Sequence, residues 1–398
     1  MNTLFSNRIL TTPKSFIREI LKVTDNPEVI SFAGGLPNSR FFPVKEIKSA
    51  ALKVLEEDGR NILQYSTTEG YLPLREYISR RYFEKKRLNI RPDEIIITNG
   101  SQQCFDLIGK TFLNKGDHVV VERPVYLGAL QSFSMFEPVI DSVPLLDDGI
   151  DTIFLKKTFD EQKIKLFYAV PNFQNPSGVT YSKQKRMELA GMLREQNSIF
   201  VEDDPYGELR FMGDDIPCVR NYLQKNIILL GSFSKIVSPG LRLGWICAEK
   251  ETMEKIVVAK QAADLHSNYL SQRILYKYLV DNDIDEHIHT IRVAYKEQRD
   301  LMVSKIEEQF PEETKCTKPE GGMFLWITLP ENLSSMELFN RAIKENVAFV
   351  PGSPFYVGGG GENTLRLNFS NSDGEKIEEG IKRLAGIIKK LISEKGGK

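Results

Sequence analysis

Short apolar runs alternate with helical spacing of apolar positions between residues 95 and 247. Runs rich in β-branched residues predict strands, namely Ile95–Thr98, Val119–Val121, Val139–Val143, Leu166–Val170, Ile199–Glu202, Ile227–Leu230 and Leu243–Cys247. This alternation predicts βα units that form a mainly parallel sheet covered by helices. Ligands of such sheets bind beyond the carboxyl ends of the strands, so we expect functional motifs directly after strands.

The flanking regions show other patterns. Apolar spacing predicts helices at Val44–Glu57 and Leu74–Leu88, and Pro13–Val23 forms a short amphipathic segment. A long charged helix is expected at Asp281–Phe310. It is followed by a strand, a helix, two short strands and a helix, at Met323–Leu329, Met336–Asn346, Ala348–Val350, Thr364–Phe369 and Lys376–Ile392. We therefore expect an α/β fold in which residues 46–290 form a large domain. Residues 291–398 are expected to form a small α+β domain, which an N-terminal segment of residues 1–45 joins.

Composition excludes several classes of function. Lys and Arg number 53 against 54 Asp and Glu, a net charge of −1, so no excess of basic charge favours nucleic acid as a partner. No apolar run approaches the roughly 18–20 residues that a membrane span needs, and MNTLFSNRIL has no signal-peptide pattern. The widely spaced Cys104, Cys218, Cys247 and Cys316 suggest neither disulfides nor a metal site. We expect a cytoplasmic protein.

The strand Ile227–Leu230 leads into chemistry-bearing residues. Gly231-Ser232-Phe233-Ser234-Lys235 presents two hydroxyls and an amine, and Arg242 follows seven positions later. Hydroxyls and a guanidinium suit a phosphate, and a lysine with a lowered pKa can form a Schiff base. A single lysine is usually a solvated surface residue. The apolar, glycine-rich surroundings of Lys235 argue against that interpretation.

Polar motifs follow three other predicted strands. Asp203 and Tyr206 come after the run that ends at Val201, Asn175 lies in the Pro171–Gly178 turn, and Ser101 opens a predicted helix after Thr98. A carboxylate at a strand end can keep a pyridine nitrogen protonated, and a helix N-terminus can bind an anion. Each motif alone is also explained by an ordinary turn or helix cap.

In this order the motifs resemble fold-type I pyridoxal-phosphate aminotransferases of class I/II. The branch that the sequence resembles contains kynurenine and 2-aminoadipate aminotransferases, and the similarity extends from Ser15–Ile20 to Leu365–Phe369. The resemblance implies pyridoxal 5′-phosphate as cofactor. It also implies transamination between an L-amino acid (aromatic, 2-aminoadipate or a broad range) and a 2-oxo acid such as 2-oxoglutarate.

The resemblance also implies roles for individual residues. Lys235 would carry the cofactor as a Schiff base and move protons, Asp203 would pair with the ring nitrogen, and Asn175 and Tyr206 would contact the ring oxygen. Tyr126 would stack on the ring, although it could equally be an ordinary buried tyrosine. The phosphate would be held by Ser101, Gln102, Ser232, Ser234 and Arg242.

Substrate and partner contacts follow from the same resemblance. Arg366 would bind the substrate α-carboxylate, beside Asn175 and the backbone of Gly35. Arg18 resembles an arginine that meets the distal group of the substrate, but a surface partner at i,i+4 spacing explains it equally well. Tyr65 would reach the cofactor phosphate of a neighbouring subunit, which implies a homodimer.

Two other functions stay open at this stage. A lyase or decarboxylase on the same fold would use the same ring chemistry on another bond. An effector domain of a transcription regulator would require a preceding winged-helix domain, and only about thirty residues precede Ser31–Asn38. Neither the glycines at Gly358–Gly361 nor the pair His287 and His289 suggests a phosphate loop or a metal site.

Overall fold

The computed structural model describes residues 4–12, 16, 20 and 26–396. Its centre is an eight-stranded sheet with the order β2-β9-β8-β7-β6-β3-β4-β5. The strand bounds are β2 Ile95–Thr98, β3 His118–Arg123, β4 Val139–Leu146, β5 Gly149–Ile150, β6 Ile164–Ala169, β7 Ile199–Asp203, β8 Ile227–Ser232 and β9 Gly244–Cys247. The seven strands predicted for this sheet are present, and of its eight strands the two-residue β5 was missed, since it is too short to show a pattern.

The sheet is mainly parallel, as predicted. Strands β3, β4, β6, β7 and β8 pair in parallel, whereas β9 runs antiparallel to both β2 and β8. Strands β2 and β8 are buried along their whole length. A sheet covered on both faces buries near-continuous apolar strands, which explains why these runs do not alternate with polar residues.

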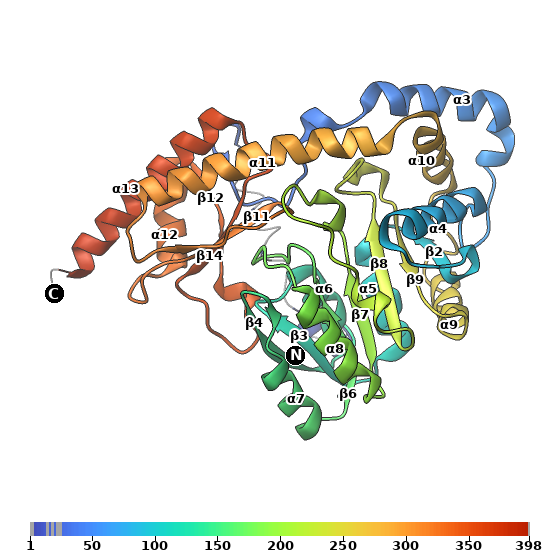
Figure 1. Cartoon of the computed structure of the whole chain (residues 1–398), viewed down its shortest axis with the longest axis horizontal. Coiled ribbons are helices and arrows are strands. Elements are labelled where there is room, and N and C mark those ends of the chain that lie inside the picture. Colours follow the sequence, from blue (N-terminus) through green and yellow to red (C-terminus); the bar gives the residue numbers. More distant parts are fainter. Residues whose placement is uncertain (1–3, 13–15, 17–19, 21–25, 397–398) are drawn as a thin grey trace.

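Helices surround this sheet (Figure 1). Their bounds are α3 Val44–Ile62, α4 Leu72–Lys86, α5 Ser101–Phe112, α6 Leu127–Ser134, α7 Thr152–Glu161, α8 Lys183–Arg194, α9 Lys250–Gln261 and α10 Tyr269–Asp281. Side-chain caps determine where α7, α8 and α10 begin. The side chains of Asp151, Ser182 and Asn268 accept hydrogen bonds from backbone N–H groups in the first turns of these helices. Short 3-10 turns lie at Ser39–Phe41, Pro92–Glu94, Gly207–Leu209, Val219–Asn221, Pro239–Leu241, Ile343–Glu345 and Ser353–Phe355.

The C-terminal part forms a second, smaller sheet. Its order is β10-β11-β14-β13, with bounds Lys315–Cys316, Phe324–Thr328, Thr364–Asn368 and Val350–Pro351. The 26-residue helix α11, Ile284–Gln309, runs from the large sheet's helices to this part, where α12 Ser335–Ala342 and α13 Gly374–Gly396 pack (Figure 1). β1 Ile30–Ser31 pairs in parallel with β12 Val347–Ala348. This pairing supports our proposal that the N-terminal segment belongs with the small domain.

Two expectations for the C-terminal part were wrong in detail. The predicted strand Ala348–Val350 is divided between β12 and β13, which belong to different sheets. The helix predicted to Asn346 ends earlier, at Ala342, and continues as a 3-10 turn. Asn346 adopts a left-handed conformation (φ 55°), which stops the helix and turns the chain into β12.

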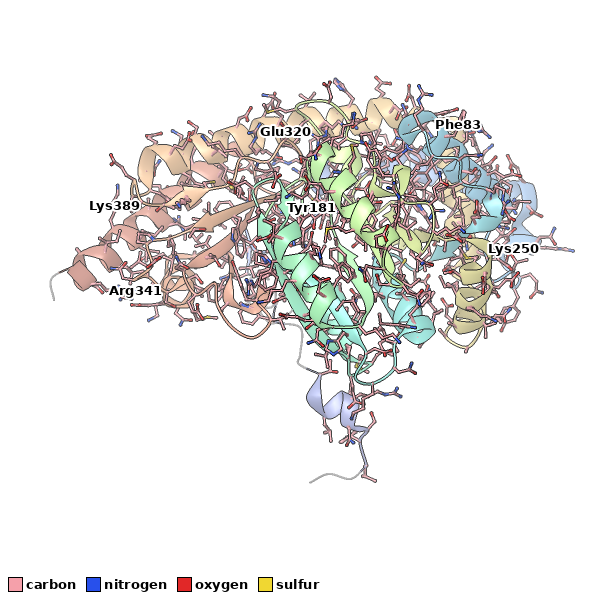
Figure 2. The ribbon with its side chains drawn as sticks, turned by 60° about the horizontal axis from the view of Figure 1, so that its bottom comes forward. Phe83, Tyr181, Lys250, Glu320, Arg341 and Lys389 are labelled. Atoms are coloured by element: carbon pink, nitrogen blue, oxygen red, sulfur yellow. The ribbon has the colours of Figure 1, made fainter. Side chains whose placement is uncertain are left out.

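The N-terminal helix α1, Asn7–Thr11, projects from the body of the molecule (Figure 2). Its Ile9 and Leu10 side chains are 50% and 56% exposed, and Leu4 before it is 88% exposed. The predicted segment Pro13–Val23 lies largely outside the described residues. None of the helices that the structure describes is long and apolar enough to cross a membrane.

Two helical glycines give opposite predictions for stability. A Cβ at Gly109 in α5 would lie 2.1 Å from the Phe136 ring, whereas a Cβ at Gly191 in α8 would meet nothing within 4 Å. Gly191→Ala is expected to raise the free energy of unfolding by about 0.5–1 kcal/mol through helix propensity. Gly109→Ala is expected to lower it by about 1–3 kcal/mol, because the ring must move. Chemical denaturation of both variants tests this, and equal shifts would contradict the packing described.

Candidate active site

The ends of several strands meet at one edge of the large sheet. The carboxyl ends of β6, β7 and β8 lie there, and the reversed β9 brings its amino end, with Arg242 just before it, to the same edge. A cavity of about 720 Å³ opens at this edge, and Arg366 reaches it from β14 of the small sheet. Among the described residues, every predicted site residue except Tyr65 lines this cavity. Arg18 lies outside the described residues.

Lys235 lies in the loop after β8, inside the cavity. Its Nζ donates a hydrogen bond of 2.7 Å to the backbone oxygen of Gly35. Burial, together with the positive charges of Arg366 and Arg242, lowers the pKa of Lys235 to about 8. An amine with this pKa has an appreciable neutral fraction near pH 7, so it can act as a nucleophile or as a base.

Asp203 is the last residue of β7 and is 2% exposed. Its Oδ2 accepts a hydrogen bond of 2.9 Å from the Tyr168 hydroxyl, while Oδ1 is buried without a partner among the described residues. Burial raises the pKa of Asp203 to about 7. A buried carboxylate oxygen without a donor is costly unless a ligand supplies one. The protonated nitrogen of a pyridine ring is such a donor, so this residue fits the predicted cofactor.

Arg366 lies at the centre of β14 and is 1% exposed. It donates from Nη1 to Asn175 Oδ1 at 2.7 Å and from Nη2 to Ala33 O at 2.6 Å, and its guanidinium lies 4.4 Å from the centre of the Phe324 ring. Its Nε has no partner within the described part of the chain, and burial lowers its pKa to about 10. A buried guanidinium with a donor to spare suits a bidentate carboxylate ligand.

Asn175 and Tyr206 face each other across the cavity wall. The Asn175 amide donates to the Tyr206 hydroxyl at 3.4 Å, and both residues are buried. Burial raises the pKa of the Tyr206 hydroxyl above its usual value, so the hydroxyl stays protonated. The pair thus offers an amide N–H and a hydroxyl to an oxygen atom placed between them.

The N-terminus of α5 and Arg242 lie side by side. Gly100 has φ 78°, and a Cβ there would lie 2.8 Å from Arg242 Nη2, so only glycine allows this close approach. Arg242 Nη2 donates to Asn99 O at 3.0 Å. The first turn of α5 begins at Ser101 and leaves backbone N–H groups for an anion. We call residues 98–103 with Arg242 the anion cradle.

The other predicted cofactor residues are Ser232, Ser234, Tyr126 and, within the cradle itself, Gln102. Ser232 Oγ accepts the backbone N–H of Ser234 at 3.1 Å, which fixes the turn before Lys235. The Gln102 side chain points instead to α6, where it donates to Ser132 Oγ at 2.7 Å. Tyr126 lies at the start of α6, and its ring lines the cavity. The roles of these residues remain predictions.

Sequence reasoning missed a buried layer beneath the cavity. Glu122 accepts hydrogen bonds from Tyr181 at 2.8 Å and from Gln174 at 3.1 Å, and Gln174 in turn accepts from both the N–H and the hydroxyl of Ser177. These bonds hold the turn that carries Asn175. Burial raises the pKa of Glu122 to about 7. Tyr168 and Glu122 are spread over separate strands, so no local motif shows them.

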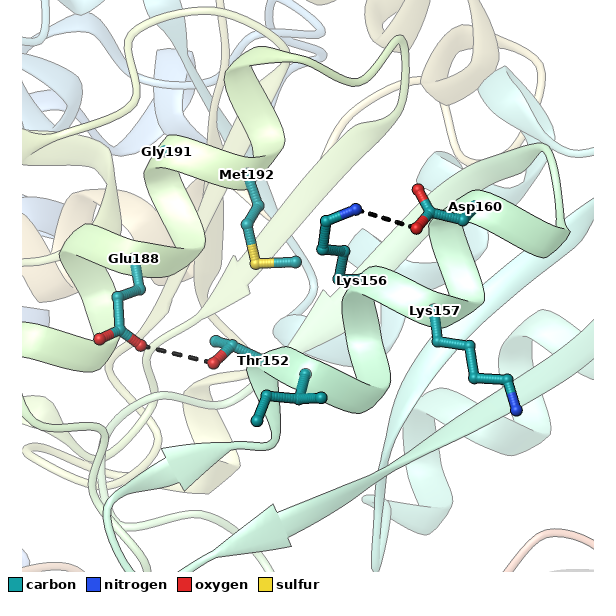
Figure 3. A pocket seen from close by; sticks show the side chains of 8 residues that line it. Thr152, Lys156, Lys157, Asp160, Glu188, Gly191 and Met192 are labelled. Carbon is teal, nitrogen blue, oxygen red and sulfur yellow. Dashed lines mark hydrogen bonds and ion pairs between the residues drawn. The ribbon is translucent and has the colours of Figure 1, made fainter.

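A second hollow, of about 610 Å³, lies between α7 and α8 (Figure 3). The surface pair Lys156–Asp160 and the contact of Thr152 with Glu188 lie along it. It shares no residue with the central cavity. Among the described residues, no group of three or more His, Cys, Asp or Glu side chains could hold a metal ion.

Comparisons with known proteins agree with this geometry. The family model for aminotransferase class I and II matches residues 28–384. The chain is similar to aromatic-amino-acid aminotransferase 1 of Thermococcus litoralis, with 43% identity over 98% of this chain and 95% of the relative. It is 42% identical to 2-aminoadipate transaminase of Thermus thermophilus, over 95% of each. Kynurenine aminotransferase of Pyrococcus horikoshii has a similar structure, with a TM-score of 0.93, 43% identity and 98% of both chains covered.

The two raised carboxyl pKa values predict how the stability of the cofactor-free protein depends on pH. Asp203 and Glu122 keep their protons to about pH 7 when folded, whereas their ordinary pKa values are 3.8 and 4.5. The folded state therefore binds more protons between about pH 4 and 7, and its stability falls as the pH rises through that range. Asp203→Asn removes one of the two groups. We expect the stability of this variant relative to the wild type to increase by about 2–3 kcal/mol between pH 5 and pH 8.

Thermal unfolding of cofactor-free wild type and Asp203→Asn at several pH values measures this difference. A difference in melting temperature that stays constant from pH 5 to pH 8 would show that Asp203 is ionised throughout.

Proposed function

Because the chain belongs to the class I and II aminotransferases, we propose that it transfers amino groups from aromatic or 2-aminoadipate-type L-amino acids to a 2-oxo acid such as 2-oxoglutarate, in the cavity around Lys235. One observation carries this proposal. The amine of Lys235, the unpartnered Oδ1 of Asp203 and the buried guanidinium of Arg366 all face the same cavity. Together they match an aldehyde, a cationic ring nitrogen and a carboxylate.

The cofactor of the chain is pyridoxal 5′-phosphate. When bound, it supplies an aldehyde that takes up the amino group and a ring that accepts electron density from the bond broken at the substrate Cα. Lys235 would hold the aldehyde end, Asp203 the ring nitrogen, and Asn175 with Tyr206 the ring oxygen. The anion cradle would hold the phosphate.

Lys235 also has the properties of the proton carrier. Its lowered pKa leaves part of the amine neutral near pH 7, so Nζ can take the proton from the substrate Cα. A base is most effective when its pKa lies near the working pH. Gly35, whose backbone oxygen accepts the Lys235 hydrogen bond, keeps Nζ within the cavity.

Arg366 would orient the substrate. Its guanidinium can bind the two α-carboxylate oxygens side by side, and Asn175 fixes the guanidinium from one side. The rings of Phe324 and Phe355 lie 4.4 and 5.5 Å from its central carbon and keep water from that end of the cavity. Fixed orientation of the reacting Cα is itself a large contribution to rate.

The substrate class rests on the relatives and on the cavity wall. Leu36, Leu127 and Gln131 line the cavity beside Tyr126, which gives one wall both apolar and polar character. Two relatives at 42–43% identity are named for aromatic amino acids and for 2-aminoadipate. We propose that this wall receives the substrate side chain. The further role of Arg18 at the distal end of the substrate is also a proposal.

We further propose that the chain acts as a homodimer. Tyr65 is 78% exposed and does not line the cavity of its own chain. Leu63 beside it is 71% exposed, and α1 carries apolar side chains away from the body (Figure 2). Such exposed apolar groups are typical of surfaces that a partner covers. A second copy would place Tyr65 at the phosphate of its neighbour.

An amino-donor panel tests the proposed reaction. Purified protein loaded with pyridoxal 5′-phosphate is mixed with 2-oxoglutarate and single amino acids, and glutamate and the new 2-oxo acid are measured. We expect equal amounts of both products, with aromatic amino acids or 2-aminoadipate preferred, and a loss of at least about 10³-fold in Lys235→Ala. Borohydride should fix the cofactor to Lys235 in the wild type only. Consumption of the donor without glutamate formation would instead indicate a lyase or decarboxylase.

Mixed dimers test the role of Tyr65. Tyr65→Ala and Lys235→Ala are each expected to be weakly active or inactive. A heterodimer of the two contains one complete site, because the Lys235→Ala subunit lends its Tyr65 to the other. Random mixing should restore about a quarter of the wild-type activity, since half of the dimers are mixed and each has one working site. Activity no greater than the sum of the two variants would show that Tyr65 does not act across the interface.

A further inference from the structure

A buried lysine lies behind the anion cradle. Lys260, in the last turn of α9, is 0% exposed, although lysine is rarely fully buried. Its Nζ lies 2.8 and 2.9 Å from the two carboxylate oxygens of Asp264, 3.0 Å from Ser267 Oγ and 3.1 Å from Gln103 Oε1. Four oxygen atoms therefore surround the ammonium, so its charge is compensated without water.

The same contacts reach the backbone of the anion cradle. Asp264 Oδ2 also accepts hydrogen bonds of 2.7 Å from the side-chain amides of Asn99 and Gln103. Gln103 Oε1, which faces Lys260, accepts the backbone N–H of Asn99 at 2.8 Å. Asn99 is thus held from behind through both its side chain and its backbone.

The carbonyl of Asn99 carries this constraint to the front of the anion cradle. It accepts the hydrogen bond of Arg242 Nη2 at 3.0 Å. Gly100 and Ser101 follow directly, and Ser101 begins α5. Fixing the Asn99 peptide therefore sets both the direction of the first N–H groups of α5 and the position of the Arg242 guanidinium.

We propose that Lys260, acting through Asp264, is a positioning residue for phosphate recognition, an inference that rests on the proposed function. Lys260 does not line the cavity in which cofactor and substrate would bind. It holds Asn99 and Gln103 so that the N-terminus of α5 and Arg242 converge on one anion. A buried, hydrogen-bonded support of this kind keeps donors in place before the ligand arrives.

The test compares two ligands that differ only in the phosphate. Full-length protein freed of cofactor is titrated with pyridoxal 5′-phosphate and with pyridoxal, and both dissociation constants are measured by absorbance. Lys260→Met keeps an unbranched side chain one atom shorter than lysine but removes the charge and the hydrogen-bond donors. We expect it to weaken pyridoxal 5′-phosphate binding by about tenfold or more, and to change pyridoxal binding less than about twofold.

Two further variants keep the test decisive. Asp264 is partly exposed, and Asp264→Asn retains the shape of its side chain. This variant is expected to show the same selective loss of pyridoxal 5′-phosphate binding even where Lys260→Met folds poorly. Lys185→Met removes another buried lysine, which lies 3.7 Å from Asp148 and contacts no part of the anion cradle. It is expected to leave both constants unchanged.

The possible outcomes separate this inference from the proposed function. If Lys260→Met and Asp264→Asn weaken the binding of both ligands equally, or of neither, the positioning role is overturned while the proposed function stands. A wild-type protein that binds pyridoxal 5′-phosphate no more tightly than pyridoxal, with no borohydride-stable link to Lys235, would overturn both.

Discussion

Three ionisable side chains, those of Lys235, Asp203 and Arg366, line the same cavity. None of them forms a salt bridge with another residue that the structure describes. Burial is the main cause that shifts the pKa of each toward its neutral form, to about 8, 7 and 10, and for Lys235 the positive charges of Arg366 and Arg242 act in the same direction. Desolvated charges of this kind destabilise a folded protein. A ligand that supplies complementary groups would offset this cost. The three side chains fit a cofactor with an aldehyde and a basic ring nitrogen, together with a substrate that has a carboxylate.

The topology of the sheet brings these groups together. Parallel strands β6, β7 and β8 end at one edge and deliver Asn175, Asp203 and Lys235. Strand β9, which runs antiparallel to β8, returns the chain to that edge and adds Arg242. Arg366 comes from the small sheet, so the cavity is complete only when the two parts of the chain are packed against each other. The long helix α11 and the pairing of β1 with β12 hold that arrangement.

Much of this could be predicted from the sequence, because the relevant signals are local. Buried strands appear as short apolar runs, and residues such as Lys235 and Asp203 directly follow them in the chain. Tyr168, Glu122 and Gln174 gave no such signal, since they act through partners 35 to 59 positions away or on another strand. The need for glycine at position 100 also depends on the folded structure, because it follows from the positive φ of 78° and the proximity of Arg242. The exposure of Tyr65 likewise depends on the folded surface.

The segment after α9 links the anion cradle to the surface of the proposed dimer. Asp264 accepts hydrogen bonds directly from Asn99 and Gln103 of the cradle, and Ser267 contacts Lys260. His266, which lies between Asp264 and Ser267 in the sequence, accepts the backbone N–H of Ser66 at 3.3 Å. The ring of His266 also packs edge-on against Tyr65, with ring centres 5.8 Å apart. One short stretch of chain therefore contacts both the donors proposed to bind a subunit's own phosphate and the tyrosine proposed to reach the neighbouring subunit. In the proposed homodimer the two sites then share a structural support, because a shift of this stretch alters a phosphate contact in each of them.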